Sequence, residues 1–482
     1  MQPGYSDSRS TRRQLLRRSA SLALTALTAL LAACSARRPT VVIPPTMTPP
    51  PLSSPAVQPP TTAPVVPTVS PQPRIDISPI SALVDAPVTL RLTGFPPQQD
   101  VSLAATVSST VGAYRSSALF RSDAQGMVDV ATQAPLSGTY SAPDVMGLFW
   151  SMASTPGTGT SLPSSRVFEV VPPWAMTLTA TVAGMTVASI TLDRRFVDSA
   201  ITRIPIRDYG LVGTLFLPEG PGPHPGLLSW GGSSGGYSET QAALLASHGF
   251  AALALAYFGV PPLPENLLNI PLEYFETAIG WMQAHAGVNG DRLAVVGTSR
   301  GGELALLVGA TFPQIKAVVG YVPSGLLWPG NDATGRHQPG PAWTYRGTPL
   351  PFVTTATSYF STQYADPADL ARATIPVEKI NGPVLLISGE DDALWPSTKL
   401  AQIAMDRLGQ YQHPYPDRHL HYAGAGHLIG EPYLPTTAAT SYYNPTVKAT
   451  LNVGGNAQGY AAAAADSWPH VLAFLQDSLR VS

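Results

Sequence analysis

The sequence has little cysteine and little charge. Its 482 residues include a single cysteine, Cys34, so no intrachain disulfide can form and no thiol elsewhere can act as a nucleophile. Charged residues make up only 12% of the chain. Residues 1–33 contain five arginines and one aspartate, and without them the chain carries 23 basic and 29 acidic residues, a net charge of −6. This balance argues against a nucleic-acid partner.

The N-terminal residues have the layout of a secretory signal. Arginines precede an apolar run that is too short for a comfortable membrane span, and small residues then lead to Cys34. LAAC, residues 31–34, resembles the cleavage box of bacterial lipoproteins, in which the cysteine becomes the acylated first residue. Arg12-Arg13 also resembles a twin-arginine export signal, the alternative being an ordinary basic segment. We expect residues 1–33 to be a removed signal peptide and Cys34 to anchor an exported lipoprotein to a membrane, the alternative being an uncleaved anchor.

Proline is abundant and unevenly placed. Many of the 50 prolines fall in residues 34–74, together with Thr, Val and Ser. Such a composition buries too little apolar surface to fold and favours extended polyproline II backbone. The segment is therefore predicted to be a disordered tether.

Residues 75–198 show the alternation that is typical of half-buried strands. In VTLRLTG, residues 88–94, Val and Leu alternate with Thr and Arg, and TLTATV, residues 177–182, has the same period. Glycine and proline clusters separate these short segments. The pattern predicts a small antiparallel β-sandwich domain.

Residues 199–482 change to short, wholly apolar segments that alternate with helical stretches. The apolar segments are GLLSW (226–230), FAALALA (250–256), LAVVG (293–297), AVVGYV (317–322) and PVLLIS (383–388). The helix candidates are residues 238–248, 271–285, 300–311, 397–408 and 466–479. Strands without a polar face belong to a parallel sheet that is covered on both sides. The order predicts a doubly wound α/β domain with a mostly parallel sheet.

A long irregular segment interrupts this order. Residues 325–380 are rich in proline, glycine and aromatic side chains and lie between two predicted core strands. Insertions of this kind often form a lid or a pocket wall. The alternative is a loop that packs a small core of its own.

The motif GTSRG, residues 297–301, places a serine at a strand-to-helix junction. Ser299 directly follows the apolar strand and precedes the helix candidate 300–311. This context is the nucleophile elbow of α/β hydrolases, in which a strained turn exposes the serine hydroxyl above the sheet. Gly297 and Gly301 would let the backbone approach closely. The alternative is a serine N-cap on an ordinary helix.

A serine nucleophile needs a base and an acid that orients it, and in this fold both follow it in the chain. GEDDALWP, residues 389–396, supplies Asp391 and Asp392 after a strand, and at most one of them can face the base. We choose Asp392 because G-x-x-D-x-x-x-P is the arrangement seen after this strand in such hydrolases. His427, in the glycine-containing loop AGAGHLI, is the predicted base.

Two further expectations concern the oxyanion hole and metals. The N–H of Arg300, next to the nucleophile, is one predicted oxyanion donor. The second should come from the loop WGGSSGG, residues 230–236, with Gly232 as first choice and Gly231 or Ser233 as alternatives. A pair of histidines near position 420 lacks a matching third ligand, so no metal is expected. The glycine-rich loop does not resemble a phosphate-binding loop, because no Gly-Lys-Ser/Thr follows it. No organic cofactor is expected for a serine hydrolase.

Nearly all of the chain from residue 75 to residue 479 resembles the acyl-CoA thioesterase and bile acid-CoA:amino acid N-acyltransferase family. The segments that carry the resemblance are ISPISALVDAPVTLRLTGFPP (77–97), GTYSAPDVMGLFWSM (138–152), GLVGTLFLPEGPGPHPGLL (210–228), LLASHGFAALALAYFG (244–259), GTSRGGELAL (297–306), LLISGEDDALWPS (385–397), AGAGHLIGEPYLP (423–435) and DSWPHVLAFL (466–475). The resemblance implies a β-sandwich followed by an α/β-hydrolase domain. It also implies a triad of Ser299, Asp392 and His427.

The resemblance also implies an activity. Thioesterases of the family carry serine as nucleophile and the amino-acid-conjugating enzyme carries cysteine, so Ser299 favours hydrolysis of acyl-CoA or another acyl thioester. CoA esters are scarce outside cells, so an exported carboxylesterase or acyltransferase that acts on other acyl esters is the main alternative. A lipid-anchored binding protein with a vestigial hydrolase domain is an alternative of another class. The sequence leaves the oligomeric state open.

Overall fold

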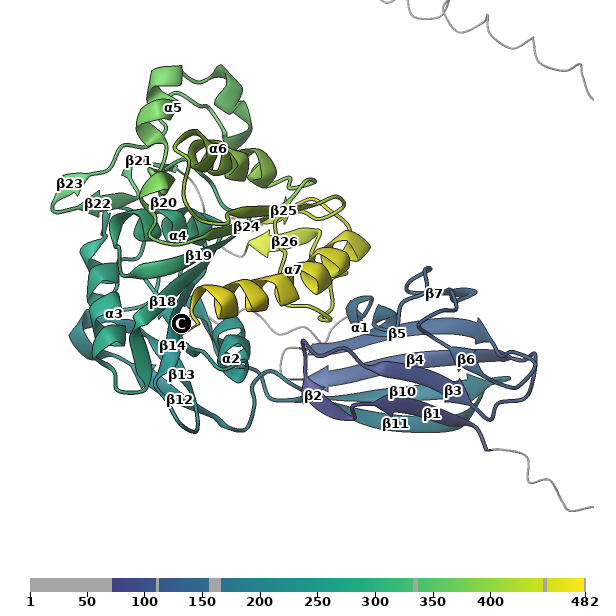
Figure 1. Cartoon of the computed structure of the whole chain (residues 1–482). Helices are drawn as coiled ribbons and strands as arrows, with labels where there is room; N and C mark the ends of the chain where they lie inside the picture. Colours follow the sequence, from purple (N-terminus) through teal and green to yellow (C-terminus); the bar gives the residue numbers. More distant parts are fainter. Residues whose placement is uncertain (1–71, 110–111, 156–165, 333–336, 445–448, 481–482) are drawn as a thin grey trace, which may run out of the picture. The chain divides into compact units, whose positions relative to one another are not determined.

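The computed structural model describes residues 72–109, 112–155, 166–332, 337–444 and 449–480 (Figure 1). These residues belong to one unit of the chain, residues 68–482. The predicted signal peptide, Cys34 and nearly all of the predicted tether lie outside the described residues. The first strand, β1, begins at Arg74, one residue before the predicted boundary at 75.

The N-terminal region contains two sheets, and the larger one has long central strands (Figure 1). A three-stranded sheet has the order β1-β3-β6, and a larger sheet has the order β2-β11-β10-β4-β5-β7, with β8 paired to β5. The bounds are β1 Arg74–Ser78, β2 Ser81–Leu83, β3 Thr89–Thr93, β4 Asp100–Ser109, β5 Gly112–Arg121, β6 Val128–Asp129, β7 Ser137–Gly138, β8 Ala153–Ser154, β10 Trp174–Val182 and β11 Met185–Arg195. The helix α1 spans Gly147–Trp150. In β3, Leu90 and Leu92 are buried while Thr89 and Arg91 are exposed, as the alternation predicts.

The C-terminal region is built on an eight-stranded sheet. Its order is β12-β13-β16-β14-β18-β19-β24-β25, and the strands from β16 to β25 pair in parallel while β12 and β13 are antiparallel at one edge. The bounds are β12 Ile201–Ile206, β13 Val212–Pro218, β14 His224–Trp230, β16 Ala251–Ala256, β18 Val288–Thr298, β19 Ile315–Tyr321, β24 Val384–Gly389 and β25 Arg418–Tyr422. All five predicted apolar segments lie in this sheet. Each of them is almost wholly buried.

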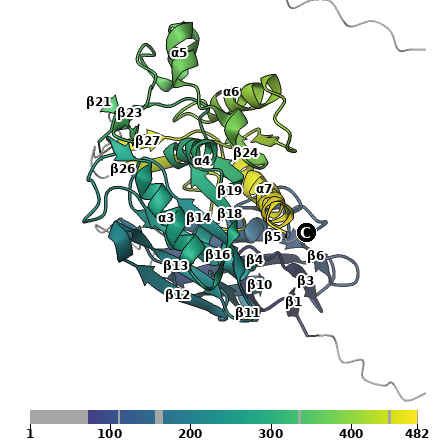
Figure 2. The same cartoon turned by 60° about the vertical axis from the view of Figure 1, so that its left-hand side comes forward.

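Helices cover both faces of this sheet (Figure 2). Successive strand residues point to opposite faces. In β18, Ala294 and Val296 belong to the apolar cluster that includes α2 and α7, whereas Leu293 and Val295 belong to the cluster that includes α3, α4 and α6. The bounds are α2 Glu239–Ser247, α3 Glu273–Ala284, α4 Arg300–Thr311, α6 Ser397–Gln410 and α7 Ala457–Ser478. The doubly wound arrangement therefore follows from strands that are apolar on both sides.

One predicted helix boundary is wrong. The last helix, predicted over residues 466–479, begins nine residues earlier, at Ala457. Asn456 caps it by accepting a hydrogen bond from the backbone N–H of Gly459 at 2.9 Å. The added turns are an alanine run, which favours helix without showing an apolar and a polar face. None of the helices in the described ranges is both long enough and apolar enough to cross a membrane.

The predicted insertion at 325–380 contains short elements and a small apolar core. The core consists of Leu326, Trp328, Val353 and Ala373 together with Trp395 and Leu400 from outside the insertion. The elements are β20 Pro329–Asn331, β21 His337–Pro341, β22 Trp343–Tyr345, β23 Thr348–Pro349, η2 Tyr359–Tyr364, α5 Pro367–Ala373 and η3 Val377–Lys379. Trp343 instead packs in the cluster of α3 and α4. The insertion thus shares a small core with Trp395 and α6 and has a second attachment to the main domain through Trp343.

The remaining elements are short connections. They are β9 Val167–Phe168, η1 Asp208–Gly210, β15 Tyr237–Ser238, β17 Ile270–Pro271, β26 Ser441–Asn444 and β27 Ala449–Asn452. The strand β15 follows the glycine-rich loop after β14, and it pairs in parallel with β9. Polar residues of the predicted site all lie at the carboxyl ends of the parallel strands, which is where ligands bind in open α/β sheets.

Candidate active site

The turn at Ser299 joins β18 to α4 and has a strained backbone. Ser299 has φ 60° and ψ −122°, a conformation that non-glycine residues rarely adopt. A Cβ on Gly297 would lie 2.0 Å from the carbonyl oxygen of Gly301, and a Cβ on Gly301 would lie 2.3 Å from the carbonyl oxygen of Gly231. Both glycines are therefore required by close backbone contacts. The turn is the sharp strand-to-helix connection that the motif predicted.

Three side chains that are far apart in the sequence form a hydrogen-bonded line. The Nε2 atom of His427 lies 2.9 Å from Oγ of Ser299, and its Nδ1 atom lies 2.8 Å from Oδ2 of Asp392. All three residues are nearly buried, with exposed fractions of 9% for Ser299, 6% for Asp392 and 4% for His427. With the proton on Nδ1, the ring donates to the carboxylate and accepts from the serine hydroxyl. This is the arrangement of a nucleophile, a base and an orienting acid.

The two neighbouring aspartates have different partners. The Oδ1 atom of Asp392 accepts from the backbone N–H groups of Leu394 at 3.0 Å and Trp395 at 3.1 Å, which leaves Oδ2 for the histidine. Asp391 instead accepts from the N–H of Gly424 at 3.0 Å, in the loop that leads to His427. The structure therefore places Asp392 beside the ring and Asp391 in a loop contact.

Other histidines of the C-terminal region lie in local contacts. His419 and His421 are in β25, where Nε2 of His419 is 2.8 Å from Oγ of Ser388 and Nδ1 of His421 is 2.6 Å from Glu390. Burial, followed by the neighbouring His421, lowers the pKa of His419 to about 4. Within the described ranges there is no group of three or more His, Cys, Asp or Glu residues that could hold a metal ion.

The glycine-rich loop after β14 lies directly against the serine. A Cβ on Gly232 would lie 2.9 Å from Cβ of Ser299 and 3.3 Å from its Oγ. Among the described residues, the backbone N–H groups of Gly232 and Arg300 donate no hydrogen bond to another backbone or side-chain group. Gly232 and Arg300, the two residues predicted to supply oxyanion donors, therefore both lie next to the serine.

A tyrosine that sequence reasoning missed holds this loop. Tyr257 follows β16 and is buried, and its hydroxyl donates to the carbonyl oxygen of Gly231 at 2.9 Å, with that of Gly232 at 3.3 Å. Burial raises the pKa of Tyr257 far above its usual value, so the hydroxyl stays protonated and can donate. The only sequence signal was an aromatic residue at the carboxyl end of a core strand.

A buried ion pair in the first turn of α4 was also missed. Nε of Arg300 lies 3.4 Å from Oε2 of Glu303, and both side chains are almost fully buried. Each also contacts the insertion: Arg300 donates to the carbonyl oxygen of Trp328 at 3.1 Å, and the indole of Trp343 donates to Glu303 at 2.8 Å. Burial raises the pKa of Glu303 to about 7, although Arg300 and the indole act in the opposite direction. The signal was an arginine and a glutamate three residues apart at the start of a helix.

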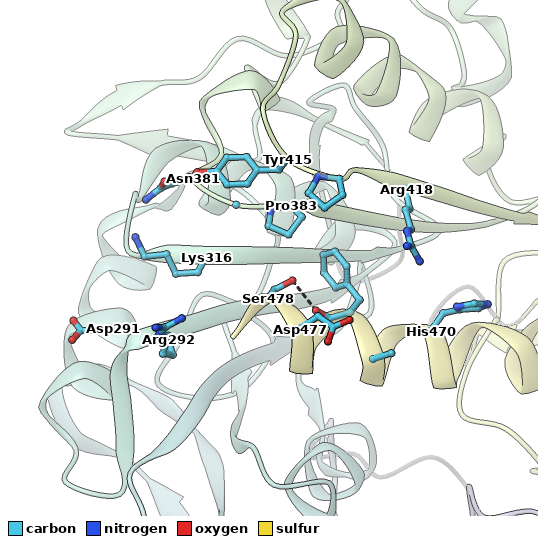
Figure 3. Close-up of a pocket in the computed structure, with 14 residues that line it drawn as sticks. Asp291, Arg292, Lys316, Asn381, Pro383, Tyr415, Arg418, His470, Asp477 and Ser478 are labelled. Carbon is cyan, nitrogen blue, oxygen red and sulfur yellow. Dashed lines mark hydrogen bonds between the residues drawn. The ribbon is translucent and has the colours of Figure 1, made fainter. Parts of the chain in front are cut away.

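A hollow of about 650 Å³ lies elsewhere, at the amino ends of the parallel strands (Figure 3). Its lining includes Lys316 of β19, Arg418 of β25 and His470 of α7, but not Ser299. Figure 3 shows Lys316 and Arg418 at opposite sides of the hollow rather than pointing toward one another. This hollow therefore has the size of a ligand site, but Lys316 and Arg418 do not converge in it.

The strand order and the serine turn define an α/β hydrolase, and the comparisons place the chain more narrowly. Residues 85–208 match the family model described as "Acyl-CoA thioester hydrolase/BAAT N-terminal region", and residues 270–481 match "BAAT / Acyl-CoA thioester hydrolase C terminal". The chain belongs to this family, as its sequence motifs predicted, and is a hydrolase-type enzyme.

Curated relatives match over almost their full length. The chain is 33% identical over 434 residues to Acyl-coenzyme A amino acid N-acyltransferase 1 of Mus musculus, covering 84% of this chain and 98% of that protein. It is 30% identical over 410 residues to Peroxisomal succinyl-coenzyme A thioesterase of Mus musculus, covering 81% of this chain and 93% of that protein. It is also 30% identical over 403 residues to Acyl-coenzyme A thioesterase 1 of Mus musculus, covering 82% and 94%.

Proposed function

We propose that this protein is a serine hydrolase that cleaves acyl thioesters through Ser299, His427 and Asp392. The observation that carries the proposal is the line of contacts from Asp392 through the imidazole to the serine hydroxyl, at 2.8 and 2.9 Å. In the first step Ser299 Oγ attacks the acyl carbonyl while His427 Nε2 takes its proton. The C–S bond then breaks, and His427 returns the proton to the leaving thiolate, so that a thiol departs and an acyl-serine remains.

Deacylation repeats these roles with water. His427 takes a proton from water, the hydroxide attacks the acyl-serine, and the proton passes to Ser299 as the carboxylic acid leaves. The negative charge that develops on the carbonyl oxygen in both steps is stabilised by the N–H groups of Arg300 and Gly232. The N-terminus of α4 adds a positive partial charge at the same place.

Acyl-CoA is the substrate class that the relatives favour. They are named as CoA thioesterases and as CoA-dependent N-acyltransferases. An oxyester formed on serine is resolved by water more readily than by an amine, whereas a thioester on cysteine is open to amines. Because this chain carries serine at position 299, we favour hydrolysis over transfer to an amino acid.

A second candidate is a carboxylesterase that acts outside the cytoplasm on acyl esters without CoA. The N-terminal signal pattern and Cys34 favour it, because a lipid-anchored enzyme outside the cell meets little CoA. Export and acylation can be tested by labelling cells with a radioactive fatty acid. Label on the wild-type chain and none on Cys34→Ser supports the anchor, whereas equal or absent labelling contradicts it.

We propose further that the two N-terminal sheets form a β-sandwich domain over residues 75–198, separate from the catalytic domain at 199–482. Buried residues of the three-stranded and the larger sheet belong to one apolar cluster, which supports packing of the two sheets against each other, and this cluster continues into α2 and α7 of the catalytic region. Limited proteolysis of the purified protein tests the boundary. Cleavage confined to residues near 199 supports two domains, and first cleavage within β4 or β10 contradicts them.

An activity-based probe tests the catalytic assignment. A fluorophosphonate should label the wild type and Ser478→Ala, a control serine at the end of α7, but not Ser299→Ala. Labelling of Ser299→Ala, or no labelling of the wild type, contradicts the proposal and favours a binding protein. Turnover of an acyl-CoA and of the matching p-nitrophenyl ester then separates the two candidates: a higher kcat/KM for the plain ester overturns the thioesterase assignment.

A further inference from the structure

Tyr257 and the oxyanion loop form a contact outside the triad. Tyr257 follows β16, which is the neighbour of β14 in the sheet, and the loop 230–236 follows β14. Both therefore lie at the carboxyl edge of the sheet, and the tyrosine hydroxyl reaches the carbonyl oxygen of Gly231 at 2.9 Å. The contact is fully buried on the tyrosine side, with 1% of the residue exposed.

Peptide geometry links this contact to the oxyanion donor. A trans peptide is planar, so the carbonyl of Gly231 and the N–H of Gly232 belong to one rigid plane and point in opposite directions. Glycine has broad conformational freedom, and nothing in residues 231–232 themselves fixes that plane. Holding the carbonyl on the tyrosine hydroxyl fixes the direction of the N–H on the other side.

Gly232, which carries that N–H, lies against the serine. The Cα of Gly232 is so close to Ser299 that a Cβ there would lie 2.9 Å from the serine Cβ. On its other side, the carbonyl of Gly231 is also confined by Gly301 of α4, where a Cβ would lie 2.3 Å away. The peptide is thus held between the tyrosine and the helix that carries the nucleophile.

We propose that Tyr257 is a positioning residue that orients the Gly231–Gly232 peptide, so that the N–H of Gly232 points at the oxyanion formed on the acyl group attached to Ser299. The inference rests on the proposed acyl chemistry of Ser299. Tyr257 does not touch the substrate in this account. It fixes the N–H of Gly232 before the reaction begins. Without it, the flexible glycine loop would have to become ordered as the transition state forms.

The aromatic ring and the hydroxyl of Tyr257 have separable roles. The ring packs against Phe258, Phe275 and Trp343, with centroid distances of 5.1, 5.8 and 5.8 Å. Phenylalanine keeps these contacts and removes only the hydroxyl. The variant Tyr257→Phe therefore frees the Gly231 carbonyl while leaving the packing of the ring in place.

The chain offers a matched control in Tyr274. Its hydroxyl also donates to a backbone carbonyl, that of Ala256, at 2.6 Å, and accepts from the N–H of Val212 at 3.2 Å. That contact joins α3 to the sheet and does not involve the loop 230–236. Tyr274→Phe therefore removes a comparable hydroxyl without touching the proposed donor.

Steady-state kinetics on the wild type and both variants test the proposal. Loss of one oxyanion donor lowers kcat by about 10²–10³-fold in other enzymes, so loss of its orientation should lower kcat about tenfold or more. We expect this fall for Tyr257→Phe with KM changed less than about threefold, and no such fall for Tyr274→Phe. Affinity for a trifluoromethyl ketone analogue of the acyl group, which forms an oxyanion on Ser299, should fall by the same factor as kcat/KM.

Three results would overturn the proposal in distinguishable ways. If the wild type turns over substrate and Tyr257→Phe keeps its kcat and its affinity for the ketone, the positioning role is wrong and the proposed function stands. If both tyrosine variants lose activity in proportion to a lower melting temperature, the hydroxyl is only structural. If the wild type neither reacts with fluorophosphonate nor hydrolyses an acyl ester or thioester, the proposed function falls and this inference falls with it.

Discussion

The two ends of the parallel sheet differ in how their polar groups are arranged. At the carboxyl ends, Ser299, Asp392 and His427 are nearly buried and bonded to one another. At the amino ends, a hollow of about 650 Å³ has charged side chains that lie apart, such as Lys316 and Arg418 (Figure 3). The comparison teaches that convergence of partnered groups, rather than the size of a hollow, indicates where chemistry occurs.

The largest expected effect comes from the acid of the triad. Asp392→Asn should lower kcat by about 10⁴-fold, because an amide no longer holds the imidazole in the required tautomer. The neighbouring change Asp391→Asn is the control, since that side chain accepts a hydrogen bond from the loop at Gly424 and does not bond to the ring. Kinetics with a p-nitrophenyl ester measure both. Equal losses in the two variants would contradict the assignment of Asp392.

A substitution at Gly301 tests the close contact between the start of α4 and the oxyanion loop. Gly301→Ala places a methyl group 2.3 Å from the carbonyl oxygen of Gly231 and must displace the oxyanion loop. A shift of about 1 Å in such a group can lower the rate about 10²-fold, and we expect a fall in kcat of that size. Gly280→Ala in α3 is the control, because its Cβ meets nothing within 4 Å. A fully active Gly301→Ala would show that the loop tolerates the displacement.

The stability of the domain at low pH tests a residue outside the catalytic line. The pKa of His419 is lowered to about 4 by burial, so the folded protein keeps the ring neutral where the unfolded chain protonates it at about 6.5. The unfolded state then binds more protons, and stability should fall as the pH drops from about 6.5 to about 4. Calorimetry between pH 6.5 and 4 should show a smaller fall in melting temperature for His419→Gln than for the wild type.

The exposed neighbour provides the comparison for this experiment. His421 lies on the same strand, with its side chain about half exposed. The variant His421→Gln should therefore retain more of the fall in melting temperature between pH 6.5 and 4 than His419→Gln does. If His421→Gln abolishes the fall and His419→Gln does not, the assignment to the buried ring is wrong.

The smallest effect is expected at the amino ends of the strands. Lys316→Gln combined with Arg418→Gln should leave kcat/KM within about twofold of the wild type, as substitutions at the surface and away from the reacting groups change free energies by about 0.5 kcal/mol or less. Acyl-CoA and a plain ester should both be assayed. A tenfold loss for acyl-CoA alone would show that this hollow takes part in binding the leaving group and would break the contrast between the two ends.

Much of the fold could be predicted because its signals are local. Apolar strands without a polar face indicate a sheet covered on both sides, and the five segments found in the sequence all lie in it. The serine turn was predictable from a strand, two glycines and a helix in succession. The start of α7 was not, because an alanine run has helix propensity but no periodic apolar face.

The parts of the site that were missed depend on contacts between distant segments. Tyr257 is one aromatic residue among many, and only the fold brings its hydroxyl to the carbonyl of Gly231. Arg300 and Glu303 look like an ordinary exposed pair on a helix, because their burial comes from an insertion whose path the sequence does not reveal. The choice between Asp391 and Asp392 required a known arrangement in similar hydrolases, since alternation alone shows only that one of them faces the ring.

The contacts of Trp328 and Trp343 with the buried pair of α4 have a consequence for engineering. Exchanging the insertion for that of a relative would remove the indole that donates to Glu303, and Arg300 would keep its hydrogen bond only if the new segment places a backbone oxygen where Trp328 has one. The Arg300–Glu303 pair would remain, but each lost hydrogen bond to a buried charged group costs about 1.5–3 kcal/mol. A variant with an exchanged insertion must therefore keep both tryptophan contacts, or Arg300 and Glu303 must be replaced together with uncharged residues.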